Sequence, residues 1–311
     1  MRSWLRLVRW NNLFIIFLTQ FLIWVCILLP LQAQRNDSFL LNGVNFSFIC
    51  LSTILIAASG YVINDYFDIK IDSINRPEKV ILGKTIHRRA ALLVHNALNL
   101  LGLLFAALVA YQAGHWSWLW VQILSSILLF FYSSHLKRRF FWGNIVIALL
   151  TALSIICLYV YEPALRAYLQ EGPMLMALNL PNPLWLLAIY TCFAFVLTWM
   201  REIVKDMEDH IGDAAEGCDT LPIRWGLKTT TVFVCIISLL ALIPLIIAFL
   251  KIEGALAYYI LVALALPLLL WVIYLPQKAT TLHYHNMSKY LKGIMLLGIG
   301  SLLIYFFQAH G

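Results

Sequence analysis

Charged residues are scarce in this chain: Asp, Glu, Lys and Arg make up only 12% of its 311 residues. A soluble domain contains about 25% charged residues, so an ordinary soluble protein is excluded. Hydrophobic residues make up 62% of the sequence. This excludes an intrinsically disordered chain, because such chains have too few apolar residues to form a core. The composition therefore indicates a membrane protein.

Several motifs of soluble enzymes are also absent. The six cysteines form no CxxC pair and have no regular spacing, so neither a zinc site nor a disulfide framework is predicted. The sequence contains no GxGxxG fingerprint and no P-loop, which argues against a nucleotide-binding fold. These absences direct attention to the apolar runs and to the few charged residues.

Long apolar runs are the main feature that is present. A membrane-spanning helix needs about 20 apolar residues. The sequence contains nine runs near this length, much longer than the strands of a membrane β-barrel. It therefore predicts an all-α polytopic membrane protein in which nine transmembrane helices form one bundle and residues 1–311 form a single domain. The nine runs are residues 12–32, 44–64, 89–112, 116–136, 141–161, 183–201, 229–250, 255–275 and 290–308.

Basic residues are distributed unevenly between the segments that join these runs. If the N-terminus is cytoplasmic, only three of the 22 Lys and Arg residues, namely Arg35, Arg166 and Lys251, fall on the opposite side. An excess of basic residues on the cytoplasmic side is typical of membrane proteins. The net charge of +7 is therefore explained by topology, not by nucleic-acid binding. We expect an uncleaved first helix and a location in the plasma (inner) membrane.

Acidic residues gather in two of the cytoplasmic segments. Eleven of the 15 Asp and Glu residues fall within residues 65–88, after the second run, and residues 202–228, after the sixth. In the first segment Asp65, Asp68 and Asp72 are three and four residues apart, and Asn64 precedes Asp68 by four. On a helix this spacing places all four side chains on one face.

The second segment has a similar pattern, because Glu202, Asp206, Asp209 and Asp213 are four, three and four residues apart. Like charges at these spacings destabilise an isolated helix. A bound cation would offset the repulsion, and oxygen ligands without clustered His or Cys favour Mg²⁺ or Ca²⁺. A solvated acidic face is the alternative interpretation of each stripe.

Basic residues accompany both acidic stripes, among them Lys70 and Lys84 near the first and Arg201 near the second. Mg²⁺ is commonly held by carboxylates together with substrate phosphates, so this mixture of charges favours a site for a metal and a diphosphate. A divalent-cation transporter is the alternative from another functional class. It would be expected to carry acids in the middle of its apolar runs, and the sequence has none there.

The two stripes belong to longer motifs. The first motif, residues 64–77, resembles the first aspartate-rich motif of the UbiA superfamily of intramembrane prenyltransferases. It reads Asn64-Asp65-x-x-Asp68-x-x-x-Asp72-x-x-Asn75-Arg76-Pro77. The second motif, residues 201–213, is similar to the superfamily's second aspartate-rich motif and contains Lys205-Asp206-x-x-Asp209-x-x-x-Asp213. Shorter pieces also resemble the superfamily: Arg9-x-x-Asn12, Tyr132-Ser133, Leu136-Lys137-Arg138 and Gly143-Asn144.

This resemblance implies a central cavity between the nine helices, capped on the cytoplasmic side by segments 65–88 and 202–228. It implies Mg²⁺, a polyprenyl diphosphate donor and a lipophilic acceptor that loses a proton. The expected catalytic residues are Asp65, Asp68, Asp206 and Asp209. The expected metal ligands are Asn64, Asp68, Asp72, Asp206, Asp209 and Asp213. The expected diphosphate contacts are Arg76, Lys79, Lys137 and Lys205, with Asn12 as a further candidate.

Within the superfamily, the second motif looks most like the digeranylgeranylglyceryl phosphate synthase-like branch. This implies transfer of a geranylgeranyl group to geranylgeranylglyceryl phosphate. Prenylation of an aromatic quinone precursor, of the homogentisate or dihydroxynaphthoate type, is the alternative. The loop at residues 79–84 departs from that branch, because it has Lys-Val-Ile-Leu-Gly-Lys in place of Arg-Pro-Ile-Pro-Ser-Gly. His283-x-His285 is expected in a solvated loop with no metal.

Overall fold

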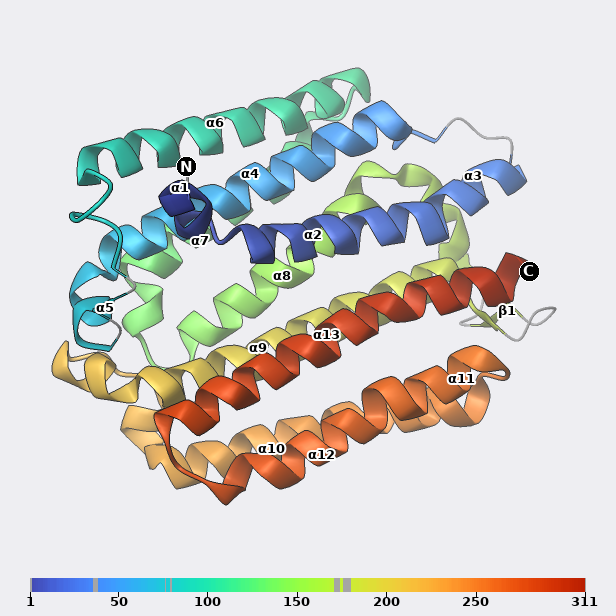
Figure 1. Cartoon of the computed structure of the whole chain (residues 1–311). Coiled ribbons are helices and arrows are strands. Elements are labelled where there is room, and N and C mark those ends of the chain that lie inside the picture. Colours follow the sequence, from blue (N-terminus) through green and yellow to red (C-terminus); the bar gives the residue numbers. More distant parts are fainter. Residues whose placement is uncertain are drawn as a thin grey trace. The chain divides into compact units, whose positions relative to one another are not determined.

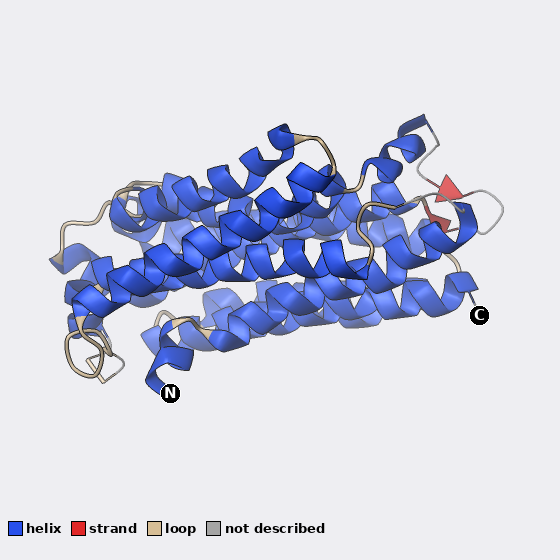
Figure 2. Cartoon of the chain, turned by 90° about the horizontal axis from the view of Figure 1, so that it is seen from above, coloured by secondary structure: helices blue, strands red, loops and turns tan. Residues whose placement is uncertain are grey.

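The computed structural model describes residues 2–35, 39–75, 77–78, 80–170, 174–175 and 180–310. These residues are almost entirely helical, and the strands among them are two antiparallel pieces of two residues each (Figure 2). The helices are α1 (Arg2–Leu7), α2 (Trp10–Ile23), η1 (Trp24–Leu28), α3 (Leu29–Arg35), α4 (Gly43–Phe67), α5 (Ile69–Asn75), α6 (Arg88–Gln112), η2 (Trp116–Leu119), α7 (Trp120–Ser134), η3 (Leu136–Arg138), α8 (Trp142–Tyr161), η4 (Pro163–Gln170), α9 (Pro183–Ala215), α10 (Leu221–Lys251), α11 (Ala255–Tyr259), η5 (Ile260–Ala265), α12 (Leu266–Tyr274), η6 (Leu275–Gln277) and α13 (Thr281–His310). The strands are β1 (Met174–Leu175) and β2 (Leu180–Pro181).

Nine helical segments within the described part of the chain are long and apolar enough to cross a membrane. This confirms the all-α fold and the predicted number of spans. They are Trp10–Ala33, Gly43–Phe67, Arg88–Gln112, Trp116–Ser134, Trp142–Tyr161, Pro183–Ala215, Leu221–Lys251, Ala255–Gln277 and Thr281–Ala309. The cytoplasmic placement of the N-terminus stays a prediction.

Three helices are longer than the apolar runs that predict them. Helix α9 continues to Ala215, α10 begins at Leu221 and α13 begins at Thr281. Apolar runs mark only the part of a helix inside the bilayer, whereas the polar turns beyond it continue the same backbone hydrogen bonds. The expectation of a solvated loop around His283 and His285 is therefore wrong, because both lie in the first turns of α13.

The chain folds into two compact units. Unit 1 contains residues Met1–Phe21, Phe39–Glu162 and His210–Thr220, and unit 2 contains Leu22–Ser38, Pro163–Asp209 and Leu221–Gly311. The boundary between them falls inside α2 and α9, so neither unit is a separate stretch of sequence. The assignment of residues 1–311 to one functional domain, capped by segments 65–88 and 202–228, remains a prediction.

In unit 1, α4 packs along α6 and α7 (Figure 1). Gly102 of α6 lets the two backbones approach closely, because a Cβ at this position would lie 3.0 Å from the carbonyl oxygen of Ser52 on α4. Small residues at helix contacts are the usual means of packing helices in a bilayer. Asn42 caps the start of α4 by accepting hydrogen bonds from the N–H groups of Val44 and Asn45. Helix α4 is thus capped at its start and packed along its length, and its last turn carries the first residues of the first motif.

In unit 2 the long helices are α9, α10 and α13, and α12 continues the shorter segments α11 and η5 (Figure 1). Helices α9 and α13 are joined by a short hydrogen bond between the hydroxyls of Tyr190 and Ser301. The indole Nε1 of Trp271 on α12 donates to the carbonyl oxygen of Met287 on α13 at 2.9 Å. These polar contacts fix α13 against its neighbours, where the bilayer itself supplies no hydrophobic force between helices.

Candidate active site

The first motif lies where α4 gives way to α5. Helix α4 ends at Phe67, Asp68 takes a non-helical backbone conformation, and α5 begins at Ile69. Backbone hydrogen bonds nevertheless run through this junction, since the N–H of Asp68 donates to Asn64 and the N–H of Asp72 donates to Asp68. The predicted continuous helix is therefore interrupted at one residue, and that residue carries the central carboxylate of the motif.

Asp68 is buried and doubly held. Asp68 is only 4% exposed. The amide Nδ2 of Asn64 donates to its Oδ2 at 2.7 Å, and the ammonium of Lys137 forms a short ion pair with the same oxygen. Burial alone would lower the pKa of Lys137. The neighbouring Asp68 carboxylate, with a smaller effect of Asp213, raises that pKa well above its usual range. Lys137 therefore stays charged beside Asp68.

The backbone around Lys137 holds it in this position. Gly143 at the start of α8 packs directly on Lys137, because a Cβ on Gly143 would lie 2.9 Å from the Cα of Lys137. Phe141 has a φ of 68°, a left-handed conformation that is rare for a bulky residue. The N–H of Asp219 donates to the carbonyl oxygen of Arg138 at 2.9 Å. The packing of Gly143, the backbone conformation of Phe141 and the hydrogen bond from Asp219 thus fix the short segment that carries Lys137.

Asp65 has a different partner from Asp68. The guanidinium Nη2 of Arg9 lies 2.8 Å from its Oδ1, and Arg9 also lies over the ring of Tyr61 at 5.1 Å. Arg9 has a φ of 52°, and the N–H of Asn12 donates to its carbonyl oxygen at 2.7 Å. The structure therefore places Asn12 in the turn that presents Arg9 to the first motif.

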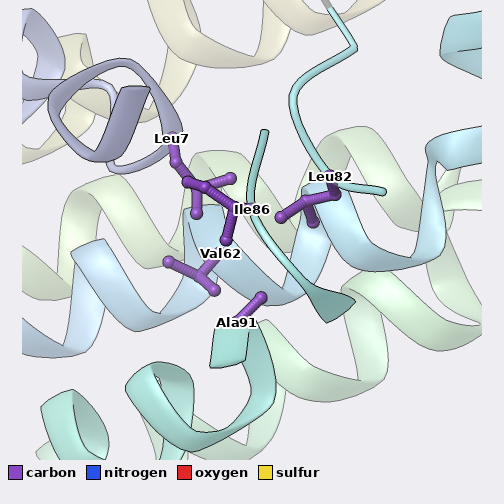
Figure 3. Packing of buried hydrophobic residues seen from close by; sticks show 5 residues of the cluster. All are labelled: Leu7, Val62, Leu82, Ile86 and Ala91. Atoms are coloured by element: carbon purple, nitrogen blue, oxygen red, sulfur yellow. The ribbon is translucent and has the colours of Figure 1, made fainter. Parts of the chain in front are cut away.

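A hydrophobic cluster anchors the segment that carries Arg9. Leu7 of α1 is fully buried and packs with Val62 of α4, Leu82, Ile86 and Ala91 (Figure 3). Leu82 and Ile86 belong to the loop after the first motif. The cluster therefore ties the N-terminal helix and this loop to the same turn of α4.

Asp72 experiences the charge of the other two carboxylates. Burial, followed by the negative charge of Asp68, raises the pKa of Asp72 to about 6. Beyond it, Asn75 accepts a hydrogen bond at 3.0 Å from the N–H of Gly212, near the end of α9. Gly212 is needed here, because a Cβ would lie 2.5 Å from the side chain of Asn75. Within unit 1, the end of the second motif therefore meets α5.

The rest of the second motif lies in unit 2, on the uninterrupted helix α9. Glu202 accepts hydrogen bonds from Arg201 at 2.9 Å and from Lys205 at 2.9 and 3.0 Å. Glu208 lies 2.9 Å from Nδ1 of His285 on α13. Asp206 and Asp209 lie on this same stretch of α9. The three-residue spacing of Glu202 and Lys205 predicts their pairing from the sequence. No sequence pattern predicts the contact between Glu208 and His285.

Two of the expected diphosphate contacts, Arg76 and Lys79, lie outside the residues that the structure describes. The other expected residues lie on described helices, except Asp68, which lies between α4 and α5. The structure brings Asn64, Asp68 and Lys137 together directly, and it pairs Asp65 with Arg9.

The donor set suits a hard divalent cation. Asp65, Asp68 and Asp72 offer carboxylate oxygens and Asn64 offers an amide oxygen, which are the ligands that such a cation prefers. Among the described residues, no three acidic, His or Cys side chains form a closed metal cage. Mg²⁺ commonly uses one or two protein carboxylates and completes its shell with phosphates and water.

Comparison with known proteins decides the family. The sequence model of the UbiA prenyltransferase family matches residues 11–283. The chain belongs to the UbiA prenyltransferase family. This UbiA protein is 30% identical over 252 residues to the digeranylgeranylglyceryl phosphate synthase of Methanosphaera stadtmanae, covering 81% of this chain and 84% of that one. It is 36% identical over 199 residues to the synthase of Methanothermobacter thermautotrophicus, covering 63% of this chain and 62% of that one.

Solved structures share the fold of this UbiA protein. One, described as digeranylgeranylglyceryl phosphate synthase in membranes, has a TM-score of 0.67 at 22% identity and covers 98% of both chains. A UbiA homologue from Archaeoglobus fulgidus bound to DMAPP and Mg²⁺ has a TM-score of 0.59 at 16% identity, covering 97% of this chain and 99% of that one. The UbiA protein is therefore a multi-pass integral membrane protein and, by family, a prenyltransferase.

Proposed function

We propose that this UbiA protein transfers a geranylgeranyl group from its diphosphate to geranylgeranylglyceryl phosphate in a reaction that depends on Mg²⁺. The observation that carries the proposal is the buried Asp68, held by Asn64 and paired with Lys137. Lys137 also experiences the charge of Asp213, so one cation interacts with carboxylates of both motifs within unit 1. The relatives' names support the choice of substrates.

Each motif would supply its own group of metal ligands. The first group is Asn64, Asp68 and Asp72, and the second is Asp206, Asp209 and Asp213. When bound, Mg²⁺ neutralises the charge that develops on a leaving diphosphate. The Mg²⁺ seen with DMAPP in the Archaeoglobus fulgidus homologue supports this choice of ion.

The chain's own cations have a separate task. In the reaction the allylic C–O bond breaks and the diphosphate leaves with the electron pair. The acceptor hydroxyl then forms the new C–O bond, and its proton passes to the leaving diphosphate, which carries it away. Lys137 and Lys205, together with Arg76 and Lys79, would hold the diphosphate as point charges. Both lysines are paired with carboxylates in the structure, so each is already oriented by Asp68 or Glu202.

Asp65 has a supporting role in this proposal. Because Arg9 already balances its charge, Asp65 would fix the end of α4, and the neighbouring Asp68 would supply the ligand oxygen. The apolar helices exclude water that would otherwise capture the allylic cation. Membership of a prenyltransferase family also favours this reaction over cation transport.

The test uses purified protein in lipid with radiolabelled geranylgeranyl diphosphate and Mg²⁺. Asp68→Asn and Asp209→Asn keep the side-chain volume but remove one charge from each motif. We expect both variants to lose transfer and the Mg²⁺-dependent binding of the donor. Glu253→Gln is the matched control, because Glu253 is an exposed acid outside both motifs. Wild-type transfer by either aspartate variant would contradict the assignment.

A further inference from the structure

Two histidines in the first turns of α13 have separate partners within unit 2. His283 and His285 are two residues apart, which is about 200° around a helix, so their rings lie on nearly opposite sides of α13. The ring Nε2 of His283 lies 3.1 Å from the carbonyl oxygen of Tyr274 and 3.2 Å from that of Leu275. The ring Nδ1 of His285 lies 2.9 Å from Oε1 of Glu208 on α9. The two rings therefore contact different helices and are not arranged as a pair of metal ligands.

The partners of these rings show which nitrogen carries a hydrogen. A carbonyl oxygen and an ionised carboxylate can only accept hydrogen bonds, so Nε2 of His283 and Nδ1 of His285 are both donors. His283 donates to carbonyl groups at the end of α12, where the hydrogen bonds of the helix run out. It thereby ties the start of α13 to α12, and His285 ties the same turns of α13 to α9.

A second contact joins α9 and α13 far from His285. The hydroxyls of Tyr190 and Ser301 share a hydrogen bond, and Tyr190 precedes Glu208 by 18 residues, or about 27 Å of helix. A helix held at two points this far apart cannot tilt or turn freely against its neighbour. The contact at Glu208 lies at the end of α9 that carries Asp206 and Asp209.

The pairing of Glu208 with His285 adds little to the stability of the fold. The side chain of His285 is 32% exposed, and ion pairs at partly exposed sites contribute little. The side chain of Glu208 is only 10% exposed, and the burial of a carboxylate is costly. Because an apolar pair would join the two helices at lower cost, the polar pair is better explained by the orientation that its hydrogen bond imposes.

We propose that His285 is a positioning residue for Asp206 and Asp209, the metal ligands of the second motif in the proposed function. Through Glu208, His285 fixes the rotation of α9 about its axis, and a rotation at Glu208 would turn the carboxylates of Asp206 and Asp209 by the same angle. A displacement of about 1 Å is enough to lower activity substantially. The inference rests on the proposed function. It goes beyond membership of the family, because the match to the family model ends at residue 283.

The test is equilibrium binding of radiolabelled geranylgeranyl diphosphate at a series of Mg²⁺ concentrations, without acceptor and well below the Tm of every variant. His285→Leu should raise the Mg²⁺ concentration for half-maximal binding about tenfold, a loss typical of residues that orient metal ligands. His285→Asn should bind the diphosphate like the wild type, because its amide nitrogen takes the place of Nδ1. Asn286→Leu is the control, since Asn286 is the exposed neighbour of His285 on α13.

The direction of the change separates positioning from other roles. Removing a positive ring beside a cation site would strengthen Mg²⁺ binding, whereas the loss of a positioning contact weakens it. A merely structural histidine would lower the Tm and leave the Mg²⁺ requirement unchanged. In a Glu208→Leu background, His285→Leu should have no further effect, because His285 acts through Glu208. Unchanged or stronger Mg²⁺ binding in His285→Leu, an equal loss in His285→Asn or Asn286→Leu, or a further loss in the Glu208→Leu background would each overturn the inference.

Asp209→Asn in the same assay separates this inference from the proposed function. If Asp209→Asn loses the Mg²⁺-dependent binding while His285→Leu keeps the wild-type Mg²⁺ requirement, the positioning role is wrong and the metal site stands. If Asp209→Asn keeps the wild-type Mg²⁺ requirement, the metal site of the second motif is wrong and the positioning role fails with it.

Discussion

Replacing Lys137 by methionine would leave the Asp68 carboxylate buried without its cation. Breaking a buried ion pair by removing one partner costs about 3–5 kcal/mol, because the remaining charge is uncompensated. The Lys137 side chain is 27% exposed, so water would reach part of the gap. We therefore expect the lower end of this range, about 3 kcal/mol. At about 2–4 °C per kcal/mol, the Tm should fall by about 6–12 °C.

The assay is thermal unfolding of purified protein in detergent with a chelator present. Arg139→Met is the control, since Arg139 is an exposed cation two residues away. The double variant Lys137→Met with Asp68→Asn should recover most of the loss, because it removes the buried charge as well. A Tm unchanged in Lys137→Met, or an equal fall in Arg139→Met, would refute the buried ion pair as a source of stability.

Three further predictions concern the same region. Gly143→Ala should destabilise the protein by about 1–3 kcal/mol through overpacking against Lys137, and it should weaken donor binding. Gly293→Ala is the control, because a Cβ at this position meets no neighbour within 4 Å. It should change neither quantity in the same unfolding and binding assays. Without divalent cations, the free energy of unfolding should fall as the pH rises from about 4 to about 6. The reason is that folded Asp72 holds its proton to a higher pH than unfolded Asp72 does. In a pH series of unfolding measurements, the Asp72→Asn variant should lose this slope. Leu7→Ala should lower the free energy of unfolding by about 2–5 kcal/mol, because it opens a cavity in the cluster that Leu7 shares with four buried residues. A measured loss below about 1 kcal/mol would show that this cluster does not anchor the N-terminal helix.

The sequence predicts the membrane helices well, because continuous apolar runs leave the backbone no alternative to helix in a bilayer. All nine runs correspond to helices of the structure. The ends are predicted less well, since polar turns such as those of α13 follow no apolar pattern. The face shared by Asn64 and Asp68 also follows from local spacing, and their side chains do meet.

Contacts between distant segments could not be predicted in the same way. The pairs Lys137–Asp68 and Arg9–Asp65 join residues 69 and 56 positions apart, and the packing of α4 against other helices determines them. The break between α4 and α5 at Asp68 could not be predicted from the sequence either, because the residues around Asp68 continue the helical periodicity. Lys137, which the sequence assigns to diphosphate together with other basic residues, thus receives its individual partner only in the folded chain.

The most direct test of the proposed function is a product assay on the wild-type protein reconstituted in lipid. Radiolabelled geranylgeranyl diphosphate is supplied with Mg²⁺ and two separate acceptor pools, one of geranylgeranylglyceryl phosphate and one of homogentisate with dihydroxynaphthoate. The proposed function predicts that label enters the glycerol ether and that a chelator abolishes the transfer. Transfer of label to the aromatic pool alone, or transfer that persists in the chelator, would contradict it.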